Sequence, residues 1–145
     1  MGVTTVHDVL EPLRDWFRDW NACLLAVDFA RARQLFGGDV SGFGTHADIV
    51  FGLDRLEAEQ WRNVWPKIAD FRFHVEALHG AIIGAHAWAA CPWSSTGFHE
   101  DGARFPRPGR ATVILKHTAD GWRGVHTHFS LNPGTPGRTF SAATK

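Results

Sequence analysis

The sequence predicts an α+β domain in which helices come first and an antiparallel sheet follows. Apolar residues recur every three or four positions up to residue 69 and every second position from Phe71, which are the periods of a helix face and of a strand. With 145 residues, of which 44% are hydrophobic, the chain is long enough to bury one core. We therefore expect one folded domain over residues 1–132 and a flexible tail over residues 133–145.

Three helices are predicted in the first half of the chain. The first begins near Asp8 and the second near Asp28, because both acidic residues precede a helical pattern. The third begins at Asp54, and Pro66 is expected to end it early. The apolar stripes consist of Val9, Leu13, Trp16, Phe17, Trp20 and Leu24 in the first helix and of Leu56, Gln60, Trp61, Val64, Trp65 and Ile68 in the third.

Alternation of apolar and polar residues predicts four strands after the helices. The first covers residues 71–75, and the second covers residues 81–91, where small residues on both faces obscure which side is buried. The last two strands, 110–117 and 122–131, are joined by a hairpin. Residues 94–109 are rich in turn-forming residues and are expected to form a mobile loop.

Charge and cysteine content restrict the class of partner. Fifteen basic residues balance fifteen acidic ones and the two signs are interspersed, so neither nucleic acid nor a membrane is indicated as a partner. Cys23 and Cys91 are too few for a disulfide framework, which is typical of a reducing compartment. The N-terminal residues lack the basic and apolar regions of a secretory signal. We expect a cytoplasmic protein whose partner is a small molecule or another protein.

Two stretches of the chain resemble a known family. "GDVSGFGT" after the second helix and "GRATVILKHTADGWRGVHTHFSL" at the end resemble the SnoaL-like branch of the nuclear transport factor 2 superfamily. The closing pattern of an Asp-Gly turn, a Trp, His-x-His and a Ser is also similar to the association domain of calcium/calmodulin-dependent protein kinase II. The resemblance implies a cone-shaped curved sheet wrapped round three helices, with a pocket between them and dimerisation through the sheet.

His126 and His128 stand at a spacing that metal sites use, and strand parity tests that interpretation. The core-facing residues of the last strand are expected to be Val125, Thr127, Phe129 and Leu131. His126, His128 and Ser130 then lie on the outer face, where no Cys, Asp or Glu is near enough to complete a zinc site. We therefore expect no metal and no cofactor, and we expect these three residues to lie in a homodimer interface.

The pocket is expected to be apolar. In the kinase association domain this face carries arginines suited to small carboxylates, whereas the resemblance places Trp88, Val113 and Phe129 at those positions here. The expected ligand is therefore a neutral, small apolar or aromatic molecule. The candidate ligand-binding residues are Phe43, His46, Trp61, Trp65, Trp88, Val113, Thr127 and Phe129. The alternative for each aromatic residue is that it only fills the core.

Two classes of function remain open. The ketosteroid isomerase mechanism uses a tyrosine, and the chain contains none, while Gly44 stands where the resemblance places the base. The His and Asp pairs of related dehydratases and cyclases fit better, with His86 as a general base oriented by Asp48 or by His46. The chain is then a cofactor-independent cyclase, dehydratase or isomerase, or else a noncatalytic ligand-binding or oligomerisation domain. A paired titratable group in the pocket would indicate the enzyme, and an aromatic filling would indicate the binding domain.

Overall fold

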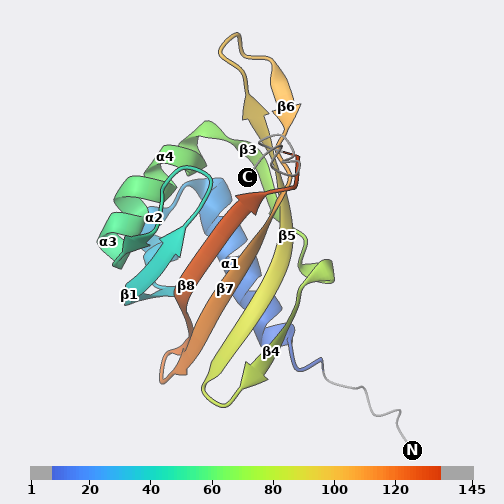
Figure 1. Cartoon of the computed structure of the whole chain (residues 1–145). Helices are drawn as coiled ribbons and strands as arrows, with labels where there is room; N and C mark the ends of the chain where they lie inside the picture. The colour runs from blue at the N-terminus through green and yellow to red at the C-terminus, as the bar shows by residue number, and fades with distance from the viewer. Residues whose placement is uncertain (1–7, 135–145) are drawn as a thin grey trace, which may run out of the picture.

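A mixed sheet of eight strands curves round the helices, as Figure 1 shows. The computed structural model describes residues 8–134. The strands are β1 (Phe36–Phe43), β2 (Val50–Phe51), β3 (Ala69–Phe73), β4 (His79–Ile83), β5 (His86–Phe98), β6 (Arg104–Pro106), β7 (Gly109–Thr118) and β8 (Gly121–Leu131). Their order is β2-β1-β8-β7-β5-β3, with β4 and β6 also paired to β5, and only β1 and β8 run parallel within this sheet. The predicted α+β cone fold is confirmed.

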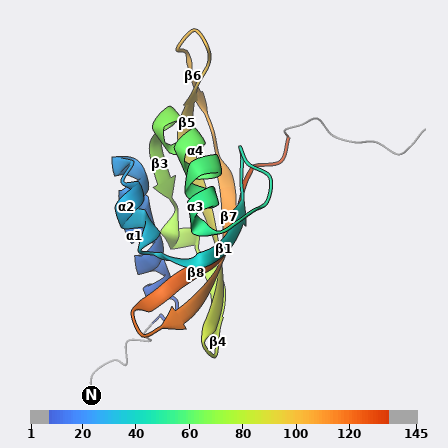
Figure 2. The ribbon, with the colours of Figure 1, turned by 90° about the vertical axis from the view of Figure 1, so that its left-hand side faces the viewer.

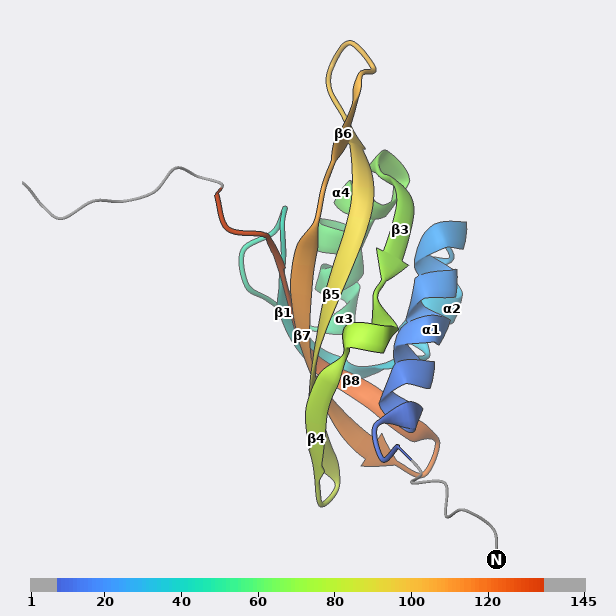
Figure 3. The same ribbon diagram turned by 90° about the vertical axis from the view of Figure 1, so that its right-hand side faces the viewer.

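The helices lie together on one side of the sheet, which Figures 2 and 3 show from two directions. They are α1 (Glu11–Ala26), α2 (Phe29–Arg33), α3 (Leu53–Arg55), the π-helix η1 (Leu56–Trp61), α4 (Arg62–Val64) and the 3₁₀ helices η2 (Trp65–Lys67) and η3 (Val75–Ala77). The segment from α3 to η2 is the predicted third helix, and it ends one residue after Pro66. No helix within residues 8–134 is long and apolar enough to cross a membrane.

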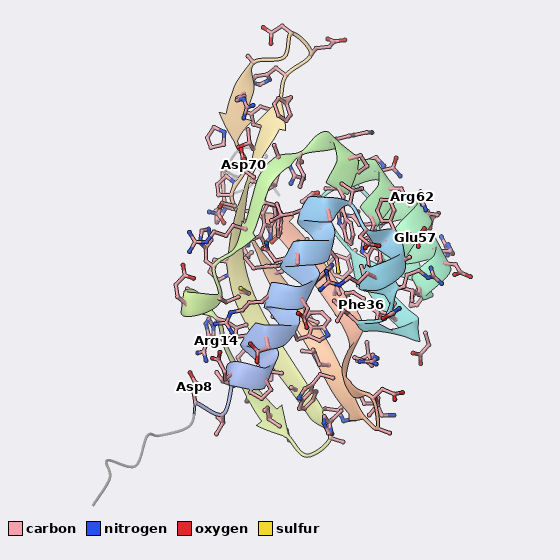
Figure 4. All side chains as sticks on the ribbon, turned by 180° about the vertical axis from the view of Figure 1, so that it is seen from behind. Asp8, Arg14, Phe36, Glu57, Arg62 and Asp70 are labelled. Carbon is pink, nitrogen blue, oxygen red and sulfur yellow. The ribbon has the colours of Figure 1, made fainter. Side chains whose placement is uncertain are left out.

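Helix α1 forms the centre of the core. The Leu10 N–H donates to the Asp8 carboxylate at 2.9 Å, and Pro12 occupies the first turn, where its missing N–H costs nothing. The rings of Phe17 and Phe73 lie 4.9 Å apart, and the side chains of this core are drawn in Figure 4. Burial of each large apolar side chain contributes about 1.5–3 kcal/mol. The inclusion of Val9 in the stripe was wrong, because α1 begins after it and its side chain is 71% exposed.

The region after β3 differs most from the prediction. Residues 81–91 do not form one strand, because Gly84 adopts a φ of 62° and turns the chain from β4 back into β5. Residues 94–109 are not a loop either, because β5 continues to Phe98 and β6 returns beside it, forming the arm at the top of Figure 1. The Ser and Thr residues of β5 hid this strand, since they are typical of turns.

Strand β8 contains a bulge. Ile114 pairs with His126 and Leu115 pairs with Gly124, so Val125 is left without a partner on β7. Gly124 is buried, and a Cβ atom on it would lie 2.6 Å from the Phe36 ring. The core-facing position was therefore assigned wrongly to Val125, and Gly124 occupies it.

Candidate functional site

A partly open chamber of about 30 Å³ lies between the inner face of the sheet and the helices. Trp61 and Trp65 stack with ring centroids 4.7 Å apart and form part of its wall. The chamber is lined by Trp20, Leu24, Phe43, Thr45, Leu56, Gln60, Trp61, Val64, Trp65, Ile68, Phe71, Trp93, Arg107, Thr127 and Phe129. Its volume is enough for about one or two water molecules, so the aromatic side chains leave little free space.

Gln60 connects the chamber to the loop between β1 and β2. Its buried side-chain oxygen accepts the backbone N–H of Ala47 at 2.7 Å and that of His46 at 3.3 Å. Gly44 lies against the same amide, because a Cβ atom there would be 2.3 Å from Gln60 Nε2. The expected position of an isomerase base is thus filled by a buried amide.

Among residues 8–134, Arg107 is the one charged side chain that lines the chamber. Its backbone is fixed by N–H···O bonds in both directions with Ser95, at 2.9 and 3.0 Å. Its guanidinium donates to Thr45 Oγ1 and lies 5.4 Å from the Trp93 ring centre. Burial lowers the pKa of Arg107. Within residues 8–134, no carboxylate lies within salt-bridge distance of this guanidinium.

An open groove of about 200 Å³ adjoins the chamber. It is lined by Thr45, His46, Asn63, Val64, Lys67, Ile68, Gly97, Phe98, Phe105 and Arg107. Thr45, Val64, Ile68 and Arg107 line both spaces, so the groove and the chamber form one site, which we call the groove–chamber site. The arm of β5 and β6 supplies one wall of the groove.

The structure divides the expected ligand-binding residues into three groups. Phe43, Trp61, Trp65, Thr127 and Phe129 line the chamber, and His46 lines the groove. Val113 is fully buried on the inner face but does not line the chamber. The placement of Trp88 on the concave face was wrong, because its side chain is 40% exposed on the outer face. The inward positions of β5 carry small residues and then Trp93.

His86 and Asp48 are not brought together at the groove–chamber site. His86 is exposed at the start of β5, seven residues before the chamber residue Trp93, or roughly 23 Å along the strand. Asp48 is exposed in the loop between β1 and β2, where its carboxylate accepts the Ile49 N–H at 2.8 Å. Neither residue lines the chamber or the groove.

Sequence reasoning missed the polar residues of the chamber. Arg107, Thr45 and the inward-facing Trp93 were not among the expected site residues, and Gln60 was assigned only to a helix stripe. The available signal was the spacing of Trp93, Ser95 and Gly97, which are all buried and mark the inner face of β5. Arg107 could not be found in this way, because its burial depends on pairing with Ser95 across the arm.

The outer face of the sheet carries the two histidines, as parity predicted. Ser41 Oγ and His126 Nδ1 lie 2.8 Å apart, and the rings of Phe43 and His128 are 4.2 Å apart. Arg110 donates to Ser130 Oγ at 2.8 Å. The pKa of His128 is lowered by burial, and then by the positive charges of His126 and Arg110. Among the described residues, no group of three His, Cys, Asp or Glu side chains could hold a metal ion.

Solved structures with this fold come from several functional classes. A nuclear transport factor 2-like superfamily protein from Salmonella enterica has a TM-score of 0.73 at 18% identity, covering 93% of this chain and 96% of its own. A ketosteroid isomerase-like protein from Erwinia carotovora has a TM-score of 0.68 at 15% identity, covering 86% and 97%. The association domain of C. elegans CaMKII has a TM-score of 0.66 at 14% identity, covering 83% and 93%. No curated protein matches the chain.

The curved sheet with the helices on its concave side is the fold of these solved structures, which include a nuclear transport factor 2-like protein. The model of the SnoaL-like domain matches residues 13–133. The chain therefore belongs to the SnoaL-like domain family.

Proposed function

We propose that this chain is a noncatalytic SnoaL-like protein that binds a small apolar or aromatic molecule at the groove–chamber site. The observation that carries the proposal is the composition of the chamber lining, which is aromatic and contains no carboxylate, imidazole or lysine. A base that abstracts a proton must lie within hydrogen-bond reach of its substrate. Among the described residues, the part of a ligand that enters the chamber has no such group beside it, whereas His46 and Lys67 line the groove.

The size of the site limits the ligand to about one ring. Typical ligand pockets occupy about 300–1,000 Å³. The groove, at about 200 Å³, and the chamber, at about 30 Å³, together fall below that range. Val64 and Ile68 supply aliphatic contacts where the two spaces meet.

Binding of single-ring compounds tests the proposal. Benzyl alcohol, benzaldehyde and cinnamate are titrated against the protein by calorimetry, and at least one is expected to bind with a 1:1 ratio. Val64→Trp fills the junction of groove and chamber and should abolish that binding, whereas Ile83→Trp, at an exposed position on β4, should not. Absence of binding by all three compounds, or equal binding by both variants, would overturn the proposal. Circular dichroism shows whether each variant is folded.

A proton-transfer enzyme is the second candidate, and His46 is the observation that favours it. This imidazole lines the groove together with Asn63 and Lys67, whereas His86 lies elsewhere. Exchange of the α-hydrogens of 1-phenyl-2-propanone in D₂O, followed by NMR, measures proton abstraction directly. If the chain is an enzyme, exchange should be faster with the protein than in buffer. This acceleration should be lost in His46→Ala. An exchange rate equal to that in buffer would contradict the enzyme and leave ligand binding as the supported function.

We also propose a homodimer through the outer face of the sheet. Trp88 and Ile114 are paired across β5 and β7, and both are about 40% exposed there. The similarity to an association domain supports self-association. Sedimentation should show a dimer for the native chain and a monomer for Ile114→Asp, while Leu25→Asp, at an exposed position on α1, should remain a dimer. A monomeric native chain at micromolar concentration would contradict this arrangement.

A further inference from the structure

The chamber wall contains hydrogen-bond donors that have no acceptor. The indole N–H groups of Trp20 and Trp93 are buried, and neither has a partner within the part of the chain that the structure describes. Buried indole N–H groups usually have a hydrogen-bond partner, because an unpaired one loses its bond to water. Both residues line the same small space, but neighbouring atoms cover their indole nitrogens, so an acceptor in that space would reach them only if the side chains around it shifted.

Arg107 adds a positive charge at the same place. Seven arginines of the described chain form ion pairs, and four others, Arg31, Arg107, Arg110 and Arg123, form none there. Of these four, Arg107 lines the chamber, and its side-chain partner is the hydroxyl of Thr45. A partly buried guanidinium has lost much of its hydration, and an anion restores the lost interaction most effectively. Because Arg107 lines both the groove and the chamber, an anionic group between the two spaces would meet it directly.

The sizes of the two spaces match a ligand with two different ends. The chamber holds the volume of about one or two water molecules, which suits a carboxylate and not a ring. The groove beside it is larger and has Val64, Ile68 and Phe105 in its walls, which suit a ring. We propose that the ligand is a single-ring aromatic carboxylate, with its carboxylate in the chamber at Arg107 and its ring in the groove. This inference rests on the proposed binding function and reverses the expected preference for neutral ligands.

Three matched probes distinguish the contribution of the carboxylate to binding affinity from that of the ring. Cinnamate, cinnamyl alcohol and cinnamamide share one carbon skeleton, and their affinities are compared by calorimetry at neutral pH. Cinnamate is expected to bind about 10- to 100-fold more tightly than the alcohol, which is the range for hydrogen bonds to a charged group. In Arg107→Met this preference should disappear, and in Arg107→Lys it should be partly retained, because lysine keeps the charge without the planar fork. Arg72→Met is the control, since Arg72 pairs with Glu76 and lines neither the groove nor the chamber.

The outcomes distinguish this inference from the function on which it rests. Equal binding of the acid and the alcohol, or a preference that persists in Arg107→Met, would overturn the carboxylate and leave aromatic binding in place. Failure of all three probes to bind, together with failure of benzyl alcohol and benzaldehyde, would overturn both. Loss of the preference in Arg72→Met as well as in Arg107→Met would show that it depends on overall charge and would also overturn the assignment to Arg107. Melting curves of each variant show that it is folded.

Discussion

Replacement of Gly109 by alanine should destabilise the fold, because the added methyl group would clash with a wall residue of the groove–chamber site. A Cβ atom at Gly109 would lie 2.3 Å from the backbone oxygen of Ser130 and 2.3 Å from Cζ2 of Trp93. Carbon atoms prefer separations of about 3.5–4.0 Å, so each contact is more than about 1 Å too short. The oxygen belongs to β8, and the indole is packed against Phe71 at 5.5 Å. Neither neighbour can move without disturbing the sheet or the chamber wall.

The expected cost is at the upper end of the range for overpacking, at about 3 kcal/mol. In a domain of this size, that loss lowers Tm by roughly 10 °C. Differential scanning calorimetry measures the loss, and near-ultraviolet circular dichroism reports the displaced indole. Gly38→Ala is the matched control, because nothing lies within 4 Å of its Cβ position, and it should leave Tm unchanged or slightly raised. Equal Tm values for the two variants would refute the reasoning.

Three further predictions concern a titration, a helix cap and a helix–sheet contact. The pKa of His128 in the folded chain lies below its usual 6.5, so the unfolded chain takes up the proton first, and the free energy of unfolding should fall as the pH drops below about 6.5. Urea titrations at several pH values should show a smaller fall in His128→Gln, and an unchanged pH profile in this variant would contradict the prediction. Asp28 accepts the Arg31 N–H at 3.1 Å, so Asp28→Ala should cost about 1 kcal/mol in urea unfolding, whereas the exposed Asp19→Ala should cost nothing measurable. Asn21 accepts the Phe73 N–H at 2.7 Å, so Asn21→Ala should cost about 1–3 kcal/mol and speed hydrogen exchange at that amide, and unchanged exchange would exclude the contact.

The helices and the last two strands could be predicted because their patterns are long. Leu13, Trp16, Phe17, Trp20 and Leu24 are all buried, as the helical spacing predicted. Strand β7 alternates strictly, so its inner face is unambiguous in the sequence. These elements supply most of the chamber wall, which is why four of the expected ligand-binding residues, Trp61, Trp65, Thr127 and Phe129, do line it.

The remaining site residues could not be predicted because they depend on β5. Ala87, Ala89 and Cys91 are small, so the sequence does not mark the buried face of β5, and the family resemblance placed Trp88 on that face. The burial of Arg107 follows from β5 reaching beyond Trp93 to pair with the returning chain. A pattern of serine, threonine and glycine indicates a turn when local propensity alone is considered, and only pairing across the arm makes it a strand.

The bulge in β8 makes one position of this strand dispensable. If Val125 were deleted, Gly124 would precede His126 directly, and the strand could pair regularly with β7 while Thr127 and Phe129 kept the partners they have now. Deletion of Thr127 or His128 would instead either bring His126 to the inward position that Thr127 now occupies or turn the Phe129 ring to the other face. Related chains can therefore differ by one residue at this position and still present the same chamber wall, so their sequences should be aligned with a gap at Val125.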